Sequence, residues 1–245
     1  MLIRLIKYAA VGIMVAACLL GCDKKSGLKG LVVDCQGYPL VGVKVVAKPV
    51  APDKGSDLSE TFTGPDGTFT LCKLVPSSSY ELLVGANGAT SKALLRVASG
   101  AAGATAGIPE PITIRFIFAG DKATALDTRT GLEWSRNANV AGRQMSWDEA
   151  MSWAHEVEIG GHKDWRLPTK EELETFIKSG GAKPEEYFTS TGFVDVPSPS
   201  TSWYWSSTSF ADRSNYTWIV ALWDGSPSYD FKGRNYNVWP VRVGE

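Results

Sequence analysis

Two adjacent serines and two histidines are the residues in this chain that come closest to suggesting hydrolytic chemistry. Ser206 and Ser207 could act as nucleophiles only with a base within reach, and His155 and His162 are the only histidines. Neither serine lies in the Gly-x-Ser-x-Gly turn of a nucleophile elbow. Cysteine chemistry is also absent from the C-terminal half of the chain, which contains these serines and histidines, because no cysteine follows Cys72. We therefore expect no enzymatic activity and no catalytic residue.

Four aspartates in the same half could offer oxygen ligands to calcium: Asp195, Asp212, Asp224 and Asp230. Their spacing matches no known calcium loop, although a structural calcium ion remains an alternative. Two cysteines without a neighbouring histidine do not make a zinc site either. We expect no metal site and no cofactor.

The segment Tyr229-Asp230-Phe231-Lys232-Gly233-Arg234-Asn235-Tyr236 combines rings with cationic and amide side chains around a glycine. Rings can stack on sugars or peptides, and such cations can pair with sulfate or carboxylate. The predicted ligand-binding residues are Tyr229, Lys232, Arg234, Asn235 and Tyr236. In the alternative interpretation, the two tyrosines pair across a hairpin and the cations are solvated turn residues.

The distribution of tryptophan divides the chain into two parts, and the candidate residues above lie in the second part. All nine tryptophans of the 245 residues lie at or after Trp134, which indicates two domains of different composition. Hydrophobic residues make up 44% and charged residues 21%, as in globular proteins. The formal net charge of −1 provides no general basic field for nucleic acid, so we expect no nucleic-acid partner.

The N-terminus has the order of a secretory signal. Arg4 and Lys7 precede an apolar run that ends in Leu19-Leu20-Gly21-Cys22. This ending closely resembles the bacterial lipobox, which implies cleavage before Cys22 and lipidation of its thiol, with palmitate among the acyl chains. We expect a signal peptide over 1–21 and a tether over 22–27. An uncleaved membrane anchor is the alternative.

Residues 28–118 are predicted to form an all-β domain, because short β-branched runs alternate with Gly/Pro turns. The pattern Gly-x-Val-x-Asp-x-x-Gly-x-Pro-Leu-x-Gly-Val-x-Val, followed by Asp-Gly-x-Phe-x-Leu, resembles the carboxypeptidase regulatory-like domain. That resemblance implies a transthyretin-like or Ig-like β-sandwich and transfers no catalytic residue.

Cys35 and Cys72 remain in this domain once Cys22 carries lipid. An even pair of cysteines outside the cytosol favours a disulfide, so we expect a Cys35–Cys72 bond. Two buried thiols in adjacent strands are the alternative.

Residues 119–245 are predicted to combine two short helices with a twisted antiparallel sheet, an α+β fold. Ser146 with Glu149 and Thr169 with Glu172 have capping-box spacing before apolar stripes. Five motifs follow in order: Asp-x-x-Thr-Gly-Leu-x-Trp, Ser-Trp-Asp-Glu-Ala, Asp-Trp-Arg-Leu-Pro-Thr-x-x-Glu-Leu, Tyr-Trp-Ser-Ser-Thr and Val-Arg-Val. Together they resemble the Lcl C-terminal domain family, which implies a C-type-lectin-like fold and a role in adhesion.

These features predict a lipid-anchored protein of the bacterial cell envelope, facing the periplasm from the inner membrane or attached to the outer membrane. Asp23 after the lipidated cysteine resembles an inner-membrane retention signal. The C-terminal head is expected to be a non-catalytic binding or adhesion module whose partner is a glycan or an envelope protein. The alternative is a structural subunit of an envelope assembly.

Overall fold

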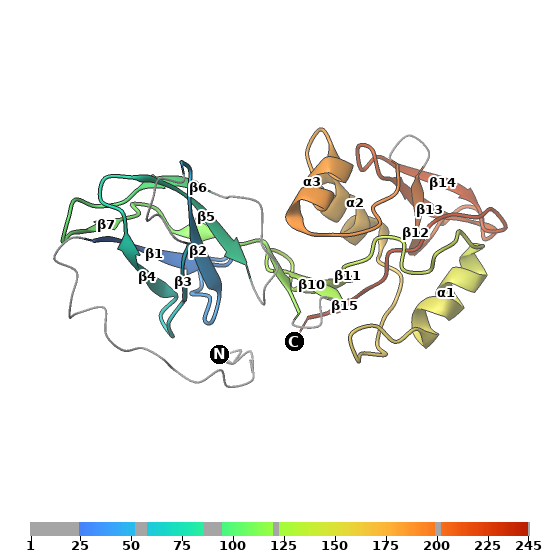
Figure 1. The fold of residues 1–245 in the computed structure, drawn as a ribbon. Coiled ribbons are helices and arrows are strands. Elements are labelled where there is room, and N and C mark those ends of the chain that lie inside the picture. The colour runs from blue at the N-terminus through green and yellow to red at the C-terminus, as the bar shows by residue number, and fades with distance from the viewer. Residues whose placement is uncertain (1–24, 52–57, 86–94, 120–122, 199–201, 245) are drawn as a thin grey trace. The chain divides into compact units, whose positions relative to one another are not determined.

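The computed structural model describes residues 25–51, 58–85, 95–119, 123–198 and 202–244 (Figure 1). The expected signal peptide and residues 22–24 of the expected tether, including Cys22, lie outside these residues. The chain divides into two compact units, and the division falls between Arg115 and Phe116.

The first unit contains two sheets (Figure 1). In one sheet, β1 pairs antiparallel with β4 and parallel with β7 and β8. In the other, the antiparallel order is β3-β2-β5-β6. The strands are β1 (Ser26–Val33), β2 (Lys44–Pro49), β3 (Ser59–Phe62), β4 (Thr68–Leu74), β5 (Ser79–Gly85), β6 (Leu95–Ala98), β7 (Thr105–Gly107) and β8 (Ile112–Thr113).

Alternate side chains of the two sheets form the core of the first unit. Phe69 and Leu71 of β4 are buried, as are Tyr80, Leu82 and Val84 of β5. The residues between them are half-buried or exposed, which is the period of two expected for strands with one buried face.

The expected disulfide between Cys35 and Cys72 is wrong. Cys72 follows Leu71, whose strand partner is Leu28 near the start of β1. Cys35 lies in the turn after Val33, at the other end of β1. A strand advances about 3.3 Å per residue, so five residues alone separate the two ends by about 16 Å. A disulfide needs Cα atoms within about 7 Å of each other.

The direction of two strands shows where the chain enters and leaves the first unit. The chain enters β1 at Ser26, and β8 pairs in parallel with Val32 and Val33 at the far end of that strand. It leaves the unit two residues after Thr113. Entry and exit therefore lie at opposite ends of β1.

The second unit contains two antiparallel sheets and three helices (Figure 1). One sheet has the order β15-β11-β10-β9 and the other the order β12-β13-β14. Their strands are β9 (Phe116–Phe118), β10 (Thr124–Asp127), β11 (Leu132–Ser135), β12 (Trp203–Ser209), β13 (Tyr216–Ala221), β14 (Pro227–Phe231) and β15 (Val241–Val243). The helices are α1 (Trp147–Glu156), α2 (Lys170–Lys178) and α3 (Pro184–Thr191).

Residues 112–118, which were expected to end the first domain, contribute two strands to different units. β8 pairs with β1, whereas β9 pairs with β10. Phe116 is buried against Phe176 and Phe193, with ring centroids 6.0 and 5.0 Å apart. Burial of these rings explains why β9 belongs with the second unit.

The helix starts differ in how they are capped. Thr169 and Glu172 form both hydrogen bonds of the expected capping box at α2. The side chain of Ser146 makes no capping bond at α1, and Glu149 pairs with Arg143 instead at 2.5 Å. The third helix was not expected from the sequence, although Pro184 at its start is a recognised signal.

Aromatic side chains fill the space between the two sheets and α2. Trp134 stacks on Phe176 with centroids 3.8 Å apart, and Trp239 meets both edge-on. These three rings are at most 2% exposed.

Within the described residues, no helix is both long enough and apolar enough to cross a bilayer.

Candidate functional site

The sheet β12-β13-β14 has two faces with different coverage. On one face, Trp205 and Ile219 pack with Ala150 and Ala154 of α1 in a buried cluster. On the other face, α2 contacts β12 and β13. The part of that second face beyond the start of α2 carries rings that remain partly exposed.

We call these rings the aromatic ledge: Phe210, Tyr216, Trp218, Tyr229 and Phe231. Two of its contacts are cross-strand pairs of β13 and β14, Tyr216 with Phe231 and Trp218 with Tyr229. Their centroids lie 6.1 and 5.9 Å apart, and Phe210 lies 4.2 Å from Tyr229. Tyr229 is 44% and Phe231 47% exposed, and the other three rings are half-buried. Strand pairing therefore holds the rings in fixed positions at the surface.

Two cations lie over rings of the ledge. The Lys170 ammonium is 4.4 Å from the centroid of Trp218, and the Arg213 guanidinium is 5.4 Å from that of Tyr216. Both distances suit cation–π attraction. The backbone of Lys170 is bound to β12, because its N–H donates to the Thr208 hydroxyl at 3.0 Å.

The polar atoms of the ledge differ from those of the core. Most buried polar ring atoms have protein partners: Trp205 Nε1 donates to Met145 O, Trp239 Nε1 to Ser135 O and Tyr204 Oη to Ala138 O. Within the described residues, no protein partner binds Trp218 Nε1 or the hydroxyls of Tyr216 and Tyr229. The ledge therefore presents donors and acceptors as well as ring faces.

The structure separates the five predicted ligand-binding residues. Tyr229 lies on the ledge, whereas Tyr236 lies on the opposite face, with its ring 4.7 Å from Trp205. The Tyr236 hydroxyl donates to Asp230 Oδ2 at 2.5 Å. Burial, followed by this bond to a carboxylate, raises the pKa of Tyr236 to about 12.

The cations of the predicted segment do not gather around Tyr229. Lys232 lies over the ring of Trp147, with its ammonium 4.0 Å from the centroid. Arg234 and Asn235 are exposed, and the Arg234 backbone N–H donates to Phe231 O. Tyr229 and Tyr236 do not pair across the hairpin either, so the two sequence-based interpretations of this segment were both incomplete.

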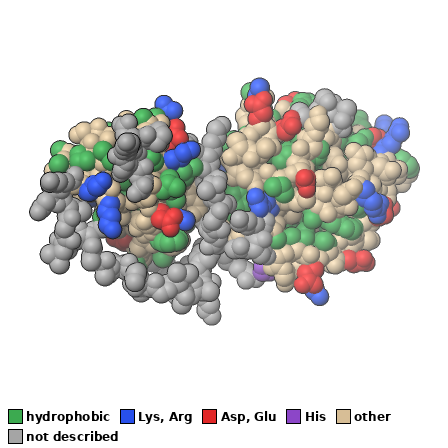
Figure 2. Space-filling view, in the orientation of Figure 1, with side chains coloured by type: hydrophobic (Ala, Val, Ile, Leu, Met, Phe, Trp, Pro, Cys, Tyr) green, Lys and Arg blue, Asp and Glu red, His purple; other side chains and the backbone are tan. Residues whose placement is uncertain are grey.

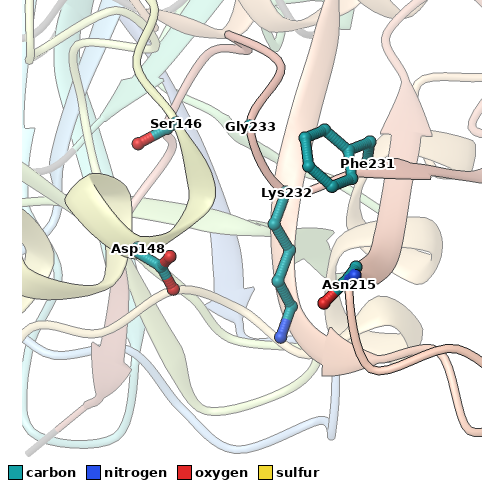
Figure 3. Close-up of a pocket in the computed structure, with 6 residues that line it drawn as sticks. All are labelled: Ser146, Asp148, Asn215, Phe231, Lys232 and Gly233. Carbon is teal, nitrogen blue, oxygen red and sulfur yellow. The ribbon is translucent and has the colours of Figure 1, made fainter.

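A shallow pocket of about 310 Å³ adjoins the ledge at Phe231 (Figure 3). Its lining residues are Ser146, Asp148, Asn215, Phe231, Lys232 and Gly233. In Figure 3 the Lys232 side chain runs between Asp148 and Asn215. The Lys232 ammonium also lies over the ring of Trp147, and the pocket adds polar side chains beside the ledge.

Sequence comparison identifies the second unit. Residues 123–242 match the Lcl C-terminal domain family. The second unit is similar to that family over these residues, and we refer to it below as the Lcl C-terminal domain. No curated protein matches the chain.

The charged motif residues of the Lcl C-terminal domain form one local ion pair and one network between distant segments. Arg166 forms two bonds of 2.7 Å to the Glu172 carboxylate at the start of α2. Arg242 is 3% exposed and pairs with Glu133 and with Asp164, the latter at 2.8 Å. These residues therefore stabilise the domain and lie outside the ledge.

The serines and histidines of the Lcl C-terminal domain do not converge. Ser206 Oγ donates to Trp218 O at 2.8 Å and Ser207 Oγ to Pro168 O at 3.2 Å. His155 is exposed on α1, and the backbone of His162 forms an isolated antiparallel β-bridge with that of Ile159. Within the described residues, no three His, Cys, Asp or Glu side chains are placed to hold a metal ion.

The alternation of rings along two strands is a sequence signal for the ledge. Tyr216 and Trp218 alternate along one strand, and Tyr229 and Phe231 along the next, so each pair shares a face. Antiparallel pairing of these strands would have placed the four rings together. Phe210 and Lys170 come from other segments, and their sequence spacing gave no such signal.

Proposed function

We propose that this protein is a lipid-anchored component of the bacterial envelope whose Lcl C-terminal domain is a non-catalytic binding module. The aromatic ledge is its contact surface, and a glycan is the ligand class that we favour. The observation that carries the proposal is a set of exposed rings, fixed by strand pairing, whose polar atoms have no protein partner among the described residues. A C-type-lectin-like arrangement of helices and sheet is part of this proposal.

In this proposal the first unit is a carboxypeptidase regulatory-like, transthyretin-like spacer between the anchor at Cys22 and the binding domain. The positions of chain entry and exit support that role. The seven steps along β1 from Ser26 to Val33 separate them by about 23 Å at 3.3 Å per residue. Such a spacer would hold the binding domain away from the lipid surface.

A structural subunit that recruits partners by strand addition is less well supported, because the edge of β14 is blocked. Lys232 N donates to Asn215 O, and Ala221 N donates to Ser226 O. The backbone N–H and C=O groups of the even-numbered residues of β14 therefore point toward β13, and those of the odd-numbered residues point to the outer edge. On the outer edge, Pro227 has no N–H to donate. The Phe231 N–H is bound by the Asp230 side chain at 2.7 Å. Few backbone groups remain for a partner strand.

The anchor and the binding surface can be tested separately. Cys22→Ala should leave an uncleaved precursor that takes up no labelled palmitate, and normal processing of this variant would contradict the anchor. Asp23→Ser tests sorting, because an unchanged position in membrane fractions would show that this residue is not the signal. A glycan array with the mature protein in detergent tests binding, and Trp218→Ala and Tyr229→Ala should abolish the signal.

Tyr38→Ala is the matched control for the array. Tyr38 lies in the first unit and is 70% exposed, so it tests whether any exposed ring supports binding. A signal that survives both ledge substitutions would remove the ledge as the contact surface.

A further inference from the structure

We propose that the aromatic ledge binds the uncharged faces of sugar rings, and that the two cations beside it lie over its rings instead of pairing with an anionic ligand. This inference rests on the proposed binding function of the same surface. It concerns the chemistry of the ligand, which would be a neutral oligosaccharide.

The partners of Lys170 are the first support for this inference. Its ammonium is 4.4 Å from the Trp218 centroid and 3.6 Å from Glu171 Oε1. Only 23% of the Lys170 side chain is exposed. An ammonium that is shared between a ring and a carboxylate has little capacity left for a sulfate.

The charge around the ledge is the second support. Arg213 lies over Tyr216 and follows the exposed Asp212 in the chain. Each of the two cations, Lys170 and Arg213, is therefore next to a carboxylate in the sequence, Glu171 and Asp212, and Lys170 also pairs with Glu171. On the visible face of the molecule, basic and acidic side chains are likewise interspersed (Figure 2). A sulfated or carboxylated polymer would meet no excess of positive charge.

The remaining charges of the predicted segment face elsewhere. Lys232 lies over Trp147, and Asp230 accepts the hydroxyl of Tyr236 on the opposite face of the sheet. Arg234 lies close enough to Tyr236 to act on the charge of that hydroxyl. Within the described residues, neither of the two cations, Lys232 and Arg234, lies over a ring of the ledge.

The ring atoms supply what a neutral sugar requires. The C–H faces of a pyranose pack on aromatic rings, while its hydroxyls need donors and acceptors at the rim. Tyr229 and Phe231 offer the most exposed rings. Trp218 Nε1 and the hydroxyls of Tyr216 and Tyr229 offer polar atoms without a protein partner among the described residues.

Salt dependence distinguishes this ligand class from an anionic one. Salt screens attraction between charges, so the affinity for a sulfated polymer falls steeply as ionic strength rises. Stacking and neutral hydrogen bonds are little affected. The affinity of the ledge for its ligand should therefore change less than about twofold between 50 and 500 mM NaCl.

The experiment is calorimetry of the mature protein in detergent at these two salt concentrations. The neutral probes are hexasaccharides of β-1,4-linked glucose, N-acetylglucosamine, xylose and mannose. Heparin and polygalacturonate are the anionic probes. At least one neutral probe should bind, and Trp218→Ala and Tyr229→Ala should each weaken it about tenfold or more, as for central interface rings.

Two further variants separate the role of the cations. Lys170→Gln and Arg213→Gln should weaken binding of the neutral probe less than about threefold, because each removes a charge but leaves the rings. Far-ultraviolet circular dichroism of all four variants should match the parent protein, and Tyr38→Ala is the exposed-ring control.

Each alternative result has a defined meaning. Binding of heparin or polygalacturonate alone, lost at high salt and in the cation variants, would overturn this inference and leave the ledge as a binding surface. A protein partner that is released by Trp218→Ala, with no sugar bound, would also overturn it. If neither ledge substitution alters the binding of any probe or partner, the proposed function fails as well.

Discussion

Trp218 and Tyr229 are direct cross-strand partners on β13 and β14, with ring centroids 5.9 Å apart and ring planes at 83°. Their neighbours along the two strands, Thr217 and Asp230, pair with each other and point to the opposite face. One strand pair therefore serves two purposes in the Lcl C-terminal domain: its inner face packs against α1, and its outer face carries the ledge.

Tyr236 should behave as a structural residue, although its sequence position predicted ligand contact. Tyr236→Phe removes the hydroxyl that donates to Asp230, and we expect the free energy of unfolding to fall by about 1 kcal/mol. Ligand binding should remain within about twofold of the parent protein. Urea unfolding followed by tryptophan fluorescence measures the first quantity and calorimetry the second. A large loss of affinity with unchanged stability would place Tyr236 in the binding surface.

The same hydroxyl gives a pH dependence. The pKa of Tyr236 is raised to about 12, and burial raises the pKa of Tyr204 as well. Because a raised pKa favours the neutral phenol in the folded state, this stability is fully present below the usual value of 10.0. It is lost as the pH rises from there through about 12. Spectrophotometric titration should show fewer late-titrating phenols in Tyr236→Phe than in the parent protein.

The division into two units and the repeated strand pattern were accessible from the sequence, because they depend on local periodicity and composition. The absence of tryptophan before Trp134 and the capping box at Thr169 are such local signals. The Cys35–Cys72 pairing failed for a non-local reason. It required the register of β1 against β4, and that register places the two cysteines at opposite ends of the strands.

The candidate site shows the same limit. In the segment from Tyr229 to Tyr236, the rings of Tyr229 and Phe231 are exposed. Its residues were wrongly expected to act together, because Tyr236 and Lys232 turn toward Trp205 and Trp147 on the other face. Side-chain direction after a turn depends on tertiary packing, which spacing alone does not determine.

The ion pair at the start of α2 should be sensitive to acid. Burial disfavours the charged form of Glu172, but hydrogen bonds from Arg166 and from the Thr169 backbone outweigh burial and lower its pKa. A lowered pKa gives stability that is present above the usual value of 4.5 and is lost as the pH falls through the folded value.

Glu172→Gln tests this pair. At pH 7 it should reduce the free energy of unfolding by about 1.5–3 kcal/mol, the usual range for hydrogen bonds to charged groups. Below the usual pKa the difference from the parent protein should shrink. Glu186→Gln is the control, since Glu186 is 66% exposed in its pair with Lys183 and should have almost no effect. An equal difference at all pH values would contradict the assignment.

The two partners of Arg242 should differ in importance because their burial differs. Its guanidinium lies between Glu133, whose side chain is 13% exposed, and Asp164, whose side chain is 59% exposed. Arg242→Met leaves the buried Glu133 without this partner and should cost about 3–5 kcal/mol. Asp164→Asn should cost less than about 1 kcal/mol. Comparable losses for both variants in urea unfolding would show that burial does not determine the strength of this network.

Trp134 and Trp239 provide a final comparison between two buried indoles. Both rings are at most 1% exposed, and both pack against Phe176. Trp239 Nε1 donates to Ser135 O at 2.9 Å, whereas Trp134 Nε1 has no hydrogen-bond partner among the described residues. Replacement by phenylalanine removes a similar ring volume at each site, but only at Trp239 does it leave a buried carbonyl without this bond.

We therefore expect Trp239→Phe to destabilise the domain by about 1 kcal/mol more than Trp134→Phe does. The measurement is the free energy of unfolding by urea, followed by far-ultraviolet circular dichroism so that the signal does not depend on the substituted indole. Equal losses would mean that the Trp134 N–H has a partner in solution, such as a buried water molecule. A greater loss at Trp134 would mean that its close stacking on Phe176 outweighs the hydrogen bond made by Trp239.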